Sequence, residues 1–148
     1  MARTAATLLP LALGLTACGM TGGAVASSGT LTAEEWQEPA DYSFAVTSSC
    51  GERTFLGDYR VDVVGGEVAA SDRRNPDGEW EPVAQLESVP TLGDLLDEVR
   101  ETAGTPDAGE VTLERDPADG HPTAISVDQL KNAIDDEQCY VITDYQPA

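Results

Sequence analysis

The sequence has few basic residues, few aromatic residues and a single histidine. Lysine and arginine together number 8, against 27 aspartate and glutamate residues, so the formal net charge is −19 over 148 residues. A surface this acidic repels phosphate backbones and anionic lipid headgroups. The shortage of basic residues therefore argues against nucleic acid as a partner and against membrane attachment through a basic surface.

The motifs of common catalytic and metal sites are also missing. The chain contains no Gly-x-Ser-x-Gly, no phosphate-binding glycine loop, no Cys-x-x-Cys and no His-Glu-x-x-His. We therefore expect a protein that is not an enzyme and that has no cofactor and no resident metal. Hydrophobic residues still make up 41% of the chain, which is enough for a packed core and argues against wholesale disorder.

The N-terminus carries a short apolar stretch instead of a membrane-spanning one. Arg3 is the only charged side chain among the first 33 residues, and the apolar stretch runs from Ala5 to Leu15. A membrane helix needs about 20 apolar residues, and Pro10 and Gly14 weaken a helix in this stretch. The pattern predicts a signal peptide over residues 1–17.

The apolar stretch ends at Leu15-Thr16-Ala17-Cys18, which resembles the lipobox of bacterial lipoproteins. In such proteins the cysteine is acylated and becomes the first residue of the mature chain. The resemblance implies lipid attachment at Cys18, with acyl chains such as palmitate holding the protein on the extracytoplasmic face of the cell membrane at about 0.8 kcal/mol per buried methylene. The alternative is an ordinary secretory signal cut nearby, with Cys18 incidental.

Small and polar residues follow the lipobox. Residues 18–33 are mostly glycine, serine, alanine and threonine, a composition typical of a flexible tether. Residues 34–148 are then long enough for one domain.

Alternating apolar residues predict strands in the first half of this domain. Apolar and polar side chains alternate from Tyr42 to Val46 and from Tyr59 to Val64. Gly65-Gly66 predicts a tight hairpin turn into a third strand over residues 67–71, because both central positions of a type I′ turn need positive φ. Residues 72–90 show no clear period and are predicted to form a long surface loop.

The strongest helix signal runs from Thr91 to Ala103. Its apolar side chains recur at i, i+3, i+4 and i+7, at Leu92, Leu95, Leu96 and Val99. Thr91 is placed to cap the N-terminus, Asp94 lies in the first turn, and Gly104 stands at the position of a C′ glycine. We expect the apolar stripe to cover a sheet.

Three more strands are predicted after the helix, over residues 110–116, 123–127 and 139–145. The order of elements predicts an α+β fold: a single antiparallel sheet of about six strands, β-β-β-α-β-β-β, covered on one face by one amphipathic helix.

Two cysteines remain in the domain once Cys18 is assigned to lipid. Cys50 closes the first predicted strand and Cys139 opens the last, so they meet if those strands are antiparallel neighbours. An exported chain enters an oxidising compartment, which favours a Cys50–Cys139 disulfide over two free thiols. The bridge predicts the spatial strand order third, second, first, sixth, fifth, fourth.

A set of motifs in fixed order resembles a known family. They are Trp36, Tyr42 ahead of Cys50, Gly57-x-Tyr59-x-Val61-x-Val63, Thr91-Leu92-x-Asp94-Leu95, and Gly120-x-Pro122 before Ile125-x-Val127-Asp128. The family consists of exported bacterial proteins classed only as a domain of unknown function, and the resemblance spans residues 34–146. It implies an exported protein, often a lipoprotein, with no catalytic residues to carry over. His121 departs from the family pattern, in which an aromatic residue is more usual.

A few polar and aromatic residues remain as candidate binding groups. His121 lies in a turn and is either an exposed turn residue or a base or metal ligand. The acidic residues Asp116 and Asp119, or the run Asp135-Asp136-Glu137, are either solvated or ligands for calcium, although neither matches an EF-hand. Trp80 either anchors its loop or stacks on a ligand.

These observations lead to one functional expectation and two alternatives. We expect a membrane-anchored lipoprotein of the cell envelope that acts as a binding or protein-interaction module for an envelope protein or ligand. An acidic ion-buffering or calcium-binding surface protein is the first alternative. An envelope hydrolase that uses paired carboxylates is the second.

Overall fold

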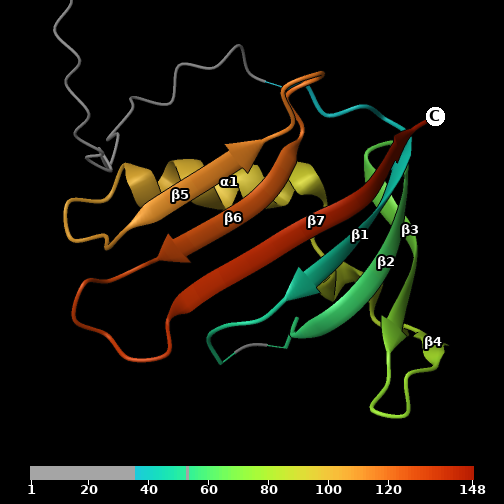
Figure 1. Cartoon of the computed structure of the whole chain (residues 1–148), viewed down its shortest axis with the longest axis horizontal. Coiled ribbons are helices and arrows are strands. Elements are labelled where there is room, and N and C mark those ends of the chain that lie inside the picture. Colours follow the sequence, from blue (N-terminus) through green and yellow to red (C-terminus); the bar gives the residue numbers. More distant parts are fainter. Residues whose placement is uncertain (1–35, 53) are drawn as a thin grey trace, which may run out of the picture. The chain divides into compact units, whose positions relative to one another are not determined.

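The centre of the molecule is one open antiparallel sheet of seven strands (Figure 1). The computed structural model describes residues 36–148 apart from residue 53. Within them the elements are β1 (Tyr42–Ser48), β2 (Gly57–Val64), β3 (Glu67–Arg74), β4 (Trp80–Pro82), the 3₁₀ turn η1 (Leu86–Ser88), α1 (Leu92–Ala103), β5 (Val111–Arg115), β6 (Pro122–Asp128) and β7 (Glu137–Pro147). The strands lie in the order β4-β3-β2-β1-β7-β6-β5.

The predicted order of six strands is confirmed, but the predicted number is wrong by one. The additional strand is β4, which pairs with the end of β3 and forms one edge of the sheet. The segment predicted to be a long loop over residues 72–90 therefore contains the end of β3, β4 and η1. A strand of three residues is too short to show an alternating pattern in the sequence. Only its pairing with β3 identifies it as a strand.

Alternation places the large apolar side chains of the central strands on one face of the sheet. In β1, Tyr42, Phe44 and Val46 are buried, and Val61 and Val63 of β2 are each only 1% exposed. The Gly65-Gly66 turn between β2 and β3 has φ values of 66° and 82°, as the hairpin prediction requires. The core of the domain lies on this face, together with the buried side of α1.

Helix α1, the one α-helix in the described residues, begins at the predicted place. The Thr91 side chain accepts a hydrogen bond from Asp94 N, and the Asp94 carboxylate accepts one from Thr91 N, which is a complete capping box. Gly104 is the C-cap with φ −82°, so the expectation of a C′ glycine there is wrong. Leu92, Leu95, Leu96 and Val99 are all buried, as predicted.

The helix covers only part of the sheet. It packs against β5 and β6, while η1 packs against β3 (Figure 1). The expectation of one face covered by one helix is therefore only roughly correct, since the helix reaches one half of that face. The other half is left to η1 and to the loops beside it.

An irregularity near the end of β7 changes which face its side chains occupy. Gln138, Tyr140 and Ile142 are buried at every second position, but Asp144 has φ 51° and the pairing with β1 shifts register between Ser43 and Ala45. A bulge of this kind re-aims the side chains that follow it. Tyr145 consequently packs against the core, where strict alternation from Ile142 would point it outward.

No helix in residues 36–52 and 54–148 is long and apolar enough to span a bilayer. The predicted signal peptide over residues 1–17, the lipid attachment at Cys18 and the tether over residues 18–33 lie outside the described residues and stay predictions.

Candidate functional site

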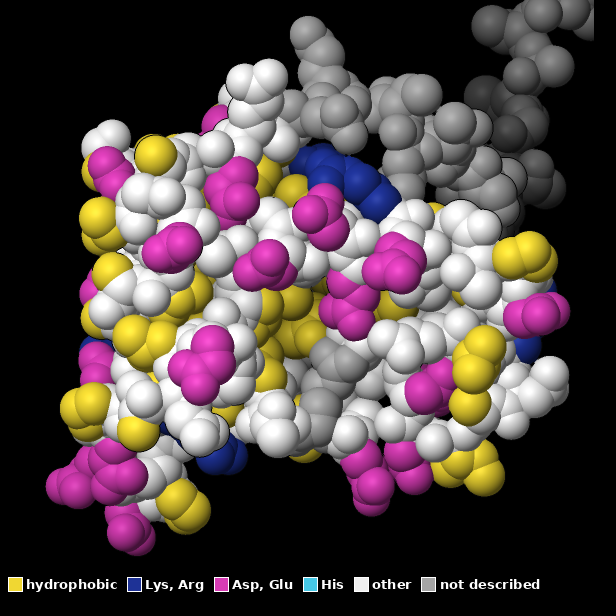
Figure 2. Space-filling model, turned by 180° about the vertical axis from the view of Figure 1, so that it is seen from behind, with side chains coloured by type: hydrophobic (Ala, Val, Ile, Leu, Met, Phe, Trp, Pro, Cys, Tyr) yellow, Lys and Arg dark blue, Asp and Glu magenta, His cyan; other side chains and the backbone are white. Residues whose placement is uncertain are grey.

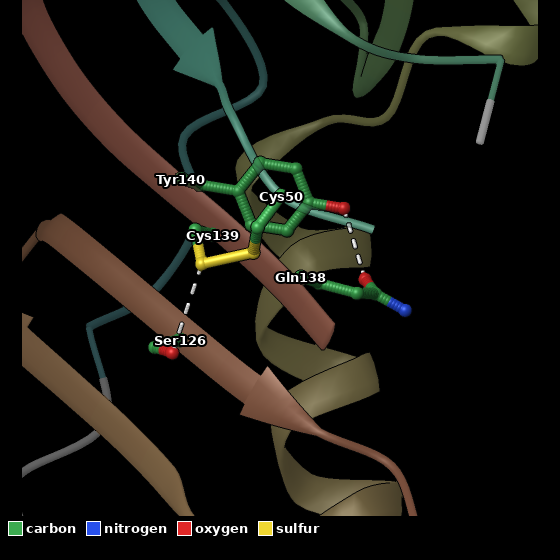
Figure 3. Close-up of a disulfide and its surroundings, with 5 residues drawn as sticks. All are labelled: Cys50, Ser126, Gln138, Cys139 and Tyr140. Carbon is green, nitrogen blue, oxygen red and sulfur yellow. Dashed lines mark hydrogen bonds between the residues drawn. A yellow bond between two sulfur atoms is a disulfide. The ribbon is translucent and has the colours of Figure 1, made fainter. Parts of the chain in front are cut away.

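The predicted disulfide is present. Cys50, just after β1, is bonded to Cys139 of β7, with the Cα atoms 5.3 Å apart and a sequence separation of 89. Ser126 of β6 lies beside the Cys139 sulfur (Figure 3). The backbone approaches closely at this point, since Ser49 N donates to Cys139 O at 3.1 Å, and a Cβ at Gly51 would lie 2.1 Å from the Glu137 carbonyl oxygen.

A groove of about 700 Å³ lies between α1, η1 and the segment that precedes β2. Its apolar lining comes from four sequence regions, with Phe55, Val89, Leu95 and Tyr140 as the main contributors. Each of these side chains is at most 7% exposed, so only the edges of the apolar groups face the opening. Figure 2 shows hydrophobic side chains at the bottom of a hollow that is bordered by Asp and Glu side chains.

The walls of the groove are acidic. They carry the side chains of Glu87, Asp94, Asp97, Glu98 and Glu101, and none of the described lining residues is lysine or arginine. Four of these acids follow the helical spacing i, i+3, i+4 and i+7, so they form a stripe along α1 next to the apolar stripe. This acidic stripe is visible in the sequence and was missed there, because only the apolar spacing was considered.

Several wall carboxylates are already held by neighbouring groups. Asp97 pairs with Arg100, and Glu98 accepts a hydrogen bond from Gln129 Nε2 at 3.1 Å. Asp94 belongs to the capping box. Glu87 and Glu101 have neither a hydrogen bond nor an ion pair from their carboxylates within the described residues, so these two are the carboxylates most available to a ligand.

A buried polar pair lies behind the apolar lining. The Tyr140 hydroxyl donates to Gln138 Oε1 at 2.9 Å, and Gln138 itself is fully buried (Figure 3). Within the described residues the Gln138 Nε2 has no hydrogen-bond partner. A buried amide group without a hydrogen-bond partner costs about 1–3 kcal/mol, so this Nε2 reduces the stability of the core beside the groove.

The N-terminus of α1 is oriented by residues of the first strand and its approach. Leu92 N donates to the Tyr42 hydroxyl at 3.0 Å, and Gly93 N donates to Glu38 Oε1 at 2.9 Å. The Tyr42 hydroxyl in turn donates to the same Glu38 oxygen. The free N–H groups of the first helical turn are therefore satisfied from outside the helix, and the acidic stripe is oriented relative to the sheet.

Aromatic rings surround this junction. Trp36 lies edge-on to both Tyr42 and Tyr145, at centroid distances of 6.3 and 6.0 Å, and Tyr42 contacts Tyr145 at 5.8 Å. The His121 ring stacks on Tyr145 at 4.2 Å. We call Trp36, Tyr42, Tyr145 and His121 the aromatic cluster. His121 therefore fills a stacking position in this cluster.

The turn between β5 and β6 gathers three metal-binding side chains. One ligand atom each from Asp116, Asp119 and His121 lies within 4.8 Å of the other two. Asp119 Oδ1 lies 2.5 Å from His121 Nδ1 and accepts from His121 N at 3.1 Å. The second acidic run is used differently: Asp136 accepts a hydrogen bond from Leu130 N, and the Asp135 carbonyl accepts one from Glu52 N.

The clearest pKa shifts belong to the aromatic cluster and its surroundings. Burial, followed by the hydrogen bond to Glu38, raises the pKa of Tyr42 far above its ordinary value. Burial also raises the pKa values of Tyr59 and Tyr145, with Asp119 and Glu38 adding a smaller electrostatic effect at Tyr145. The hydrogen bonds from His121 lower the pKa of Asp119.

Trp80 is neither a core anchor nor an open stacking platform. It is partly exposed in β4, and the Arg60 guanidinium lies over its ring at 4.1 Å from the centroid. A cation–π contact of this kind occupies one face of the ring.

A family model described as "Family of unknown function (DUF6174)" matches residues 30–147. Comparisons with curated proteins and with solved structures find no match.

Proposed function

Because the chain belongs to this family of unknown function, we propose a function from its own geometry: a lipid-anchored binding module of the cell envelope whose groove along α1 holds a cationic segment of another protein. The observation that carries the proposal is the groove itself, which combines an apolar lining with five wall carboxylates. Clusters of one charge sign around a low-dielectric lining concentrate oppositely charged ligands.

The chemistry of the groove selects lysine or arginine beside apolar side chains. These residues bury an aliphatic stem against apolar surface while the charged head stays at the rim. The exposed edges of Phe55 and Val89 offer the apolar contact, and Glu87 and Glu101 lie where a charged head would reach them. Charge complementarity of this kind contributes more to specificity and association rate than to affinity.

The domain architecture supports a function at a membrane surface. In this proposal acyl chains on Cys18 anchor the protein and residues 18–33 hold the domain a short distance from the bilayer. The acidic domain is repelled by anionic lipid, so the groove stays available to proteins in the envelope. Full-length protein should fractionate with membranes, and Cys18→Ala protein should not; equal soluble amounts of both would leave a plain secreted protein.

The groove is tested with a fluorescein-labelled peptide that alternates lysine with leucine. Anisotropy titration should give saturable binding to the full chain, and affinity should fall as salt rises. The double variant Glu87→Gln/Glu101→Gln should bind about five- to tenfold more weakly, since each exposed charge pair is worth up to about 1 kcal/mol.

A matched control separates the groove from the overall negative charge. Glu110→Gln/Glu114→Gln removes the same two charges from exposed positions beside and on the β5 edge. This control should bind the peptide like the unmodified chain. If both double variants weaken binding equally, or if an all-lysine peptide binds as well as the lysine–leucine peptide, the groove is not the recognition site.

A further inference from the structure

The turn between β5 and β6 differs from the other acidic segments because an imidazole joins its carboxylates. The ligand atoms of Asp116, Asp119 and His121 lie within 4.8 Å of one another. We propose that this turn is a binding site for a divalent first-row transition ion of the Zn²⁺ class, with Asp116, Asp119 and His121 as its three protein ligands. The site is separate from the groove, and the two proposals stand or fall independently.

The donor set points to this class of ion. Imidazole nitrogen suits zinc, copper and nickel, whereas calcium takes six to eight oxygen ligands. Two carboxylates and one imidazole are three protein ligands, which leaves a fourth tetrahedral position for water, as in open zinc sites. An ion of charge +2 bound by two carboxylates is also neutralised locally.

The histidine ring is held in place before any ion arrives. It stacks on Tyr145 at 4.2 Å, and the Tyr145 ring is in turn held by Trp36 and Tyr42. The His121 side chain is 14% exposed, while the Asp119 side chain is 45% exposed. The ring is thus fixed by packing, and an ion can approach from the solvent side of Asp119.

The backbone of the turn is also braced. Asp116 N donates to His121 O, and Gly120 N donates to Asp116 O, each at 2.9 Å. Arg115 Nη1 donates to Gly120 O at 2.8 Å, which adds a side-chain hydrogen bond to the backbone of the turn. Tetrahedral ligands at zinc distances lie about 3.4 Å apart. An ion would therefore replace the direct contact between Asp119 Oδ1 and His121 Nδ1 and lengthen the distance between these atoms from 2.5 Å by about 1 Å.

The experiment uses the untagged full chain, because His121 is its one histidine and gives a single imidazole signal. Titration calorimetry with Zn²⁺ should show one equivalent bound, and the imidazole resonances should shift in step. Asp116→Asn and Asp119→Asn should each weaken binding about tenfold or more. Asp135→Asn removes the same charge from another turn and should leave zinc affinity unchanged.

His121→Phe separates the metal site from the stacking role. A phenylalanine ring preserves the contact with Tyr145 but offers no ligand, so the variant should keep the thermal midpoint of the metal-free chain and lose zinc affinity at least about tenfold. Equal affinity in His121→Phe, or imidazole resonances that do not move, would overturn the proposal and assign binding to scattered carboxylates. Ca²⁺ binding as tight as Zn²⁺ binding would also overturn the assigned class of ion.

Discussion

The two ends of the β1–β7 strand pair are joined by different chemistry. At one end, Cys50 after β1 is bonded to Cys139 near the start of β7. At the other end, Tyr42 at the start of β1 contacts Tyr145 near the end of β7. The disulfide acts mainly by restricting the unfolded chain, whereas the aromatic contact acts through burial in the folded state.

The two ends also differ in what else they hold. The disulfide end is local, since its additional backbone bonds join residues 49–52 to the start of β7 and the loop before it. The aromatic end reaches further, because Tyr42 binds the N-terminus of α1 and Tyr145 supports His121. The covalent link therefore supplies stability next to Tyr140 of the groove lining, and the noncovalent end holds the N-terminus of α1 and the His121 ring.

The largest expected effect comes from removing the covalent link. Cys50→Ser/Cys139→Ser should lower the free energy of unfolding by up to about 4–5 kcal/mol, the chain-entropy value for a loop of 89 residues. Denaturant melts of the oxidised chain and the double variant measure the loss. Reducing agent should destabilise the unmodified chain and leave the variant unaffected; the same midpoint for all samples would mean that the bridge contributes nothing.

Truncating the buried face of α1 should have the next largest effect. Leu95→Ala and Leu96→Ala should each cost about 2–5 kcal/mol, because both side chains are only 2% exposed. Glu101→Ala, on an exposed position of the same helix, should change stability by less than about 0.5 kcal/mol. Similar denaturation midpoints for the three variants would make the helix peripheral to the core.

A smaller effect is expected when the aromatic end loses one hydroxyl. Tyr42→Phe keeps the ring but leaves Leu92 N without its acceptor, at a cost of about 1–3 kcal/mol. Tyr59→Phe is the matched control, because within the described residues that hydroxyl makes one longer bond, 3.2 Å to Leu56 O. The thermal midpoint of Tyr42→Phe should be lower than that of Tyr59→Phe. The reverse order would contradict the positioning role of Tyr42.

The smallest effect concerns alkaline pH. The raised pKa values of Tyr42, Tyr59 and Tyr145 mean that the folded chain holds phenolic protons that the unfolded chain releases near its ordinary tyrosine value of about 10. Stability is therefore complete below that pH and falls as pH rises above it. In Tyr42→Phe the free energy of unfolding should fall less steeply with rising pH, and thermal melts at several alkaline pH values will show this. The same pH dependence in both proteins would mean that groups other than Tyr42 cause the fall.

Local sequence patterns were enough to predict most of the fold, because alternation and helical spacing indicate which face of a strand or helix each side chain occupies. The alternation from Tyr42 to Val46, the Gly65-Gly66 turn and the capping residues at Thr91 and Asp94 all appear where they were expected. β4 and the bulge at Asp144 were not predicted. Both depend on pairing with a neighbouring strand, which leaves no period in a short segment.

The candidate sites show the same division. The acidic stripe on α1 can be recognised from the helical spacing of its four acids, from Asp94 to Glu101. The groove also needs Phe55 and Val89, which come from two other segments of the chain. The turn containing Asp116 and His121 is evident from its glycine and proline residues, whereas its support by Tyr145 requires β7 to bulge.

The sequence by itself determined the strand faces, the helix with its cap and the pairing of Cys50 with Cys139, because periodicity, turn chemistry and cysteine number are local or countable properties. Only the tertiary structure decided that α1 covers half of one face and that an acidic groove opens beside it. It also decided that the one histidine stacks on a tyrosine and contacts a carboxylate through Nδ1. These features depend on how far each element reaches across the sheet, and that distance is set by packing between segments remote in sequence.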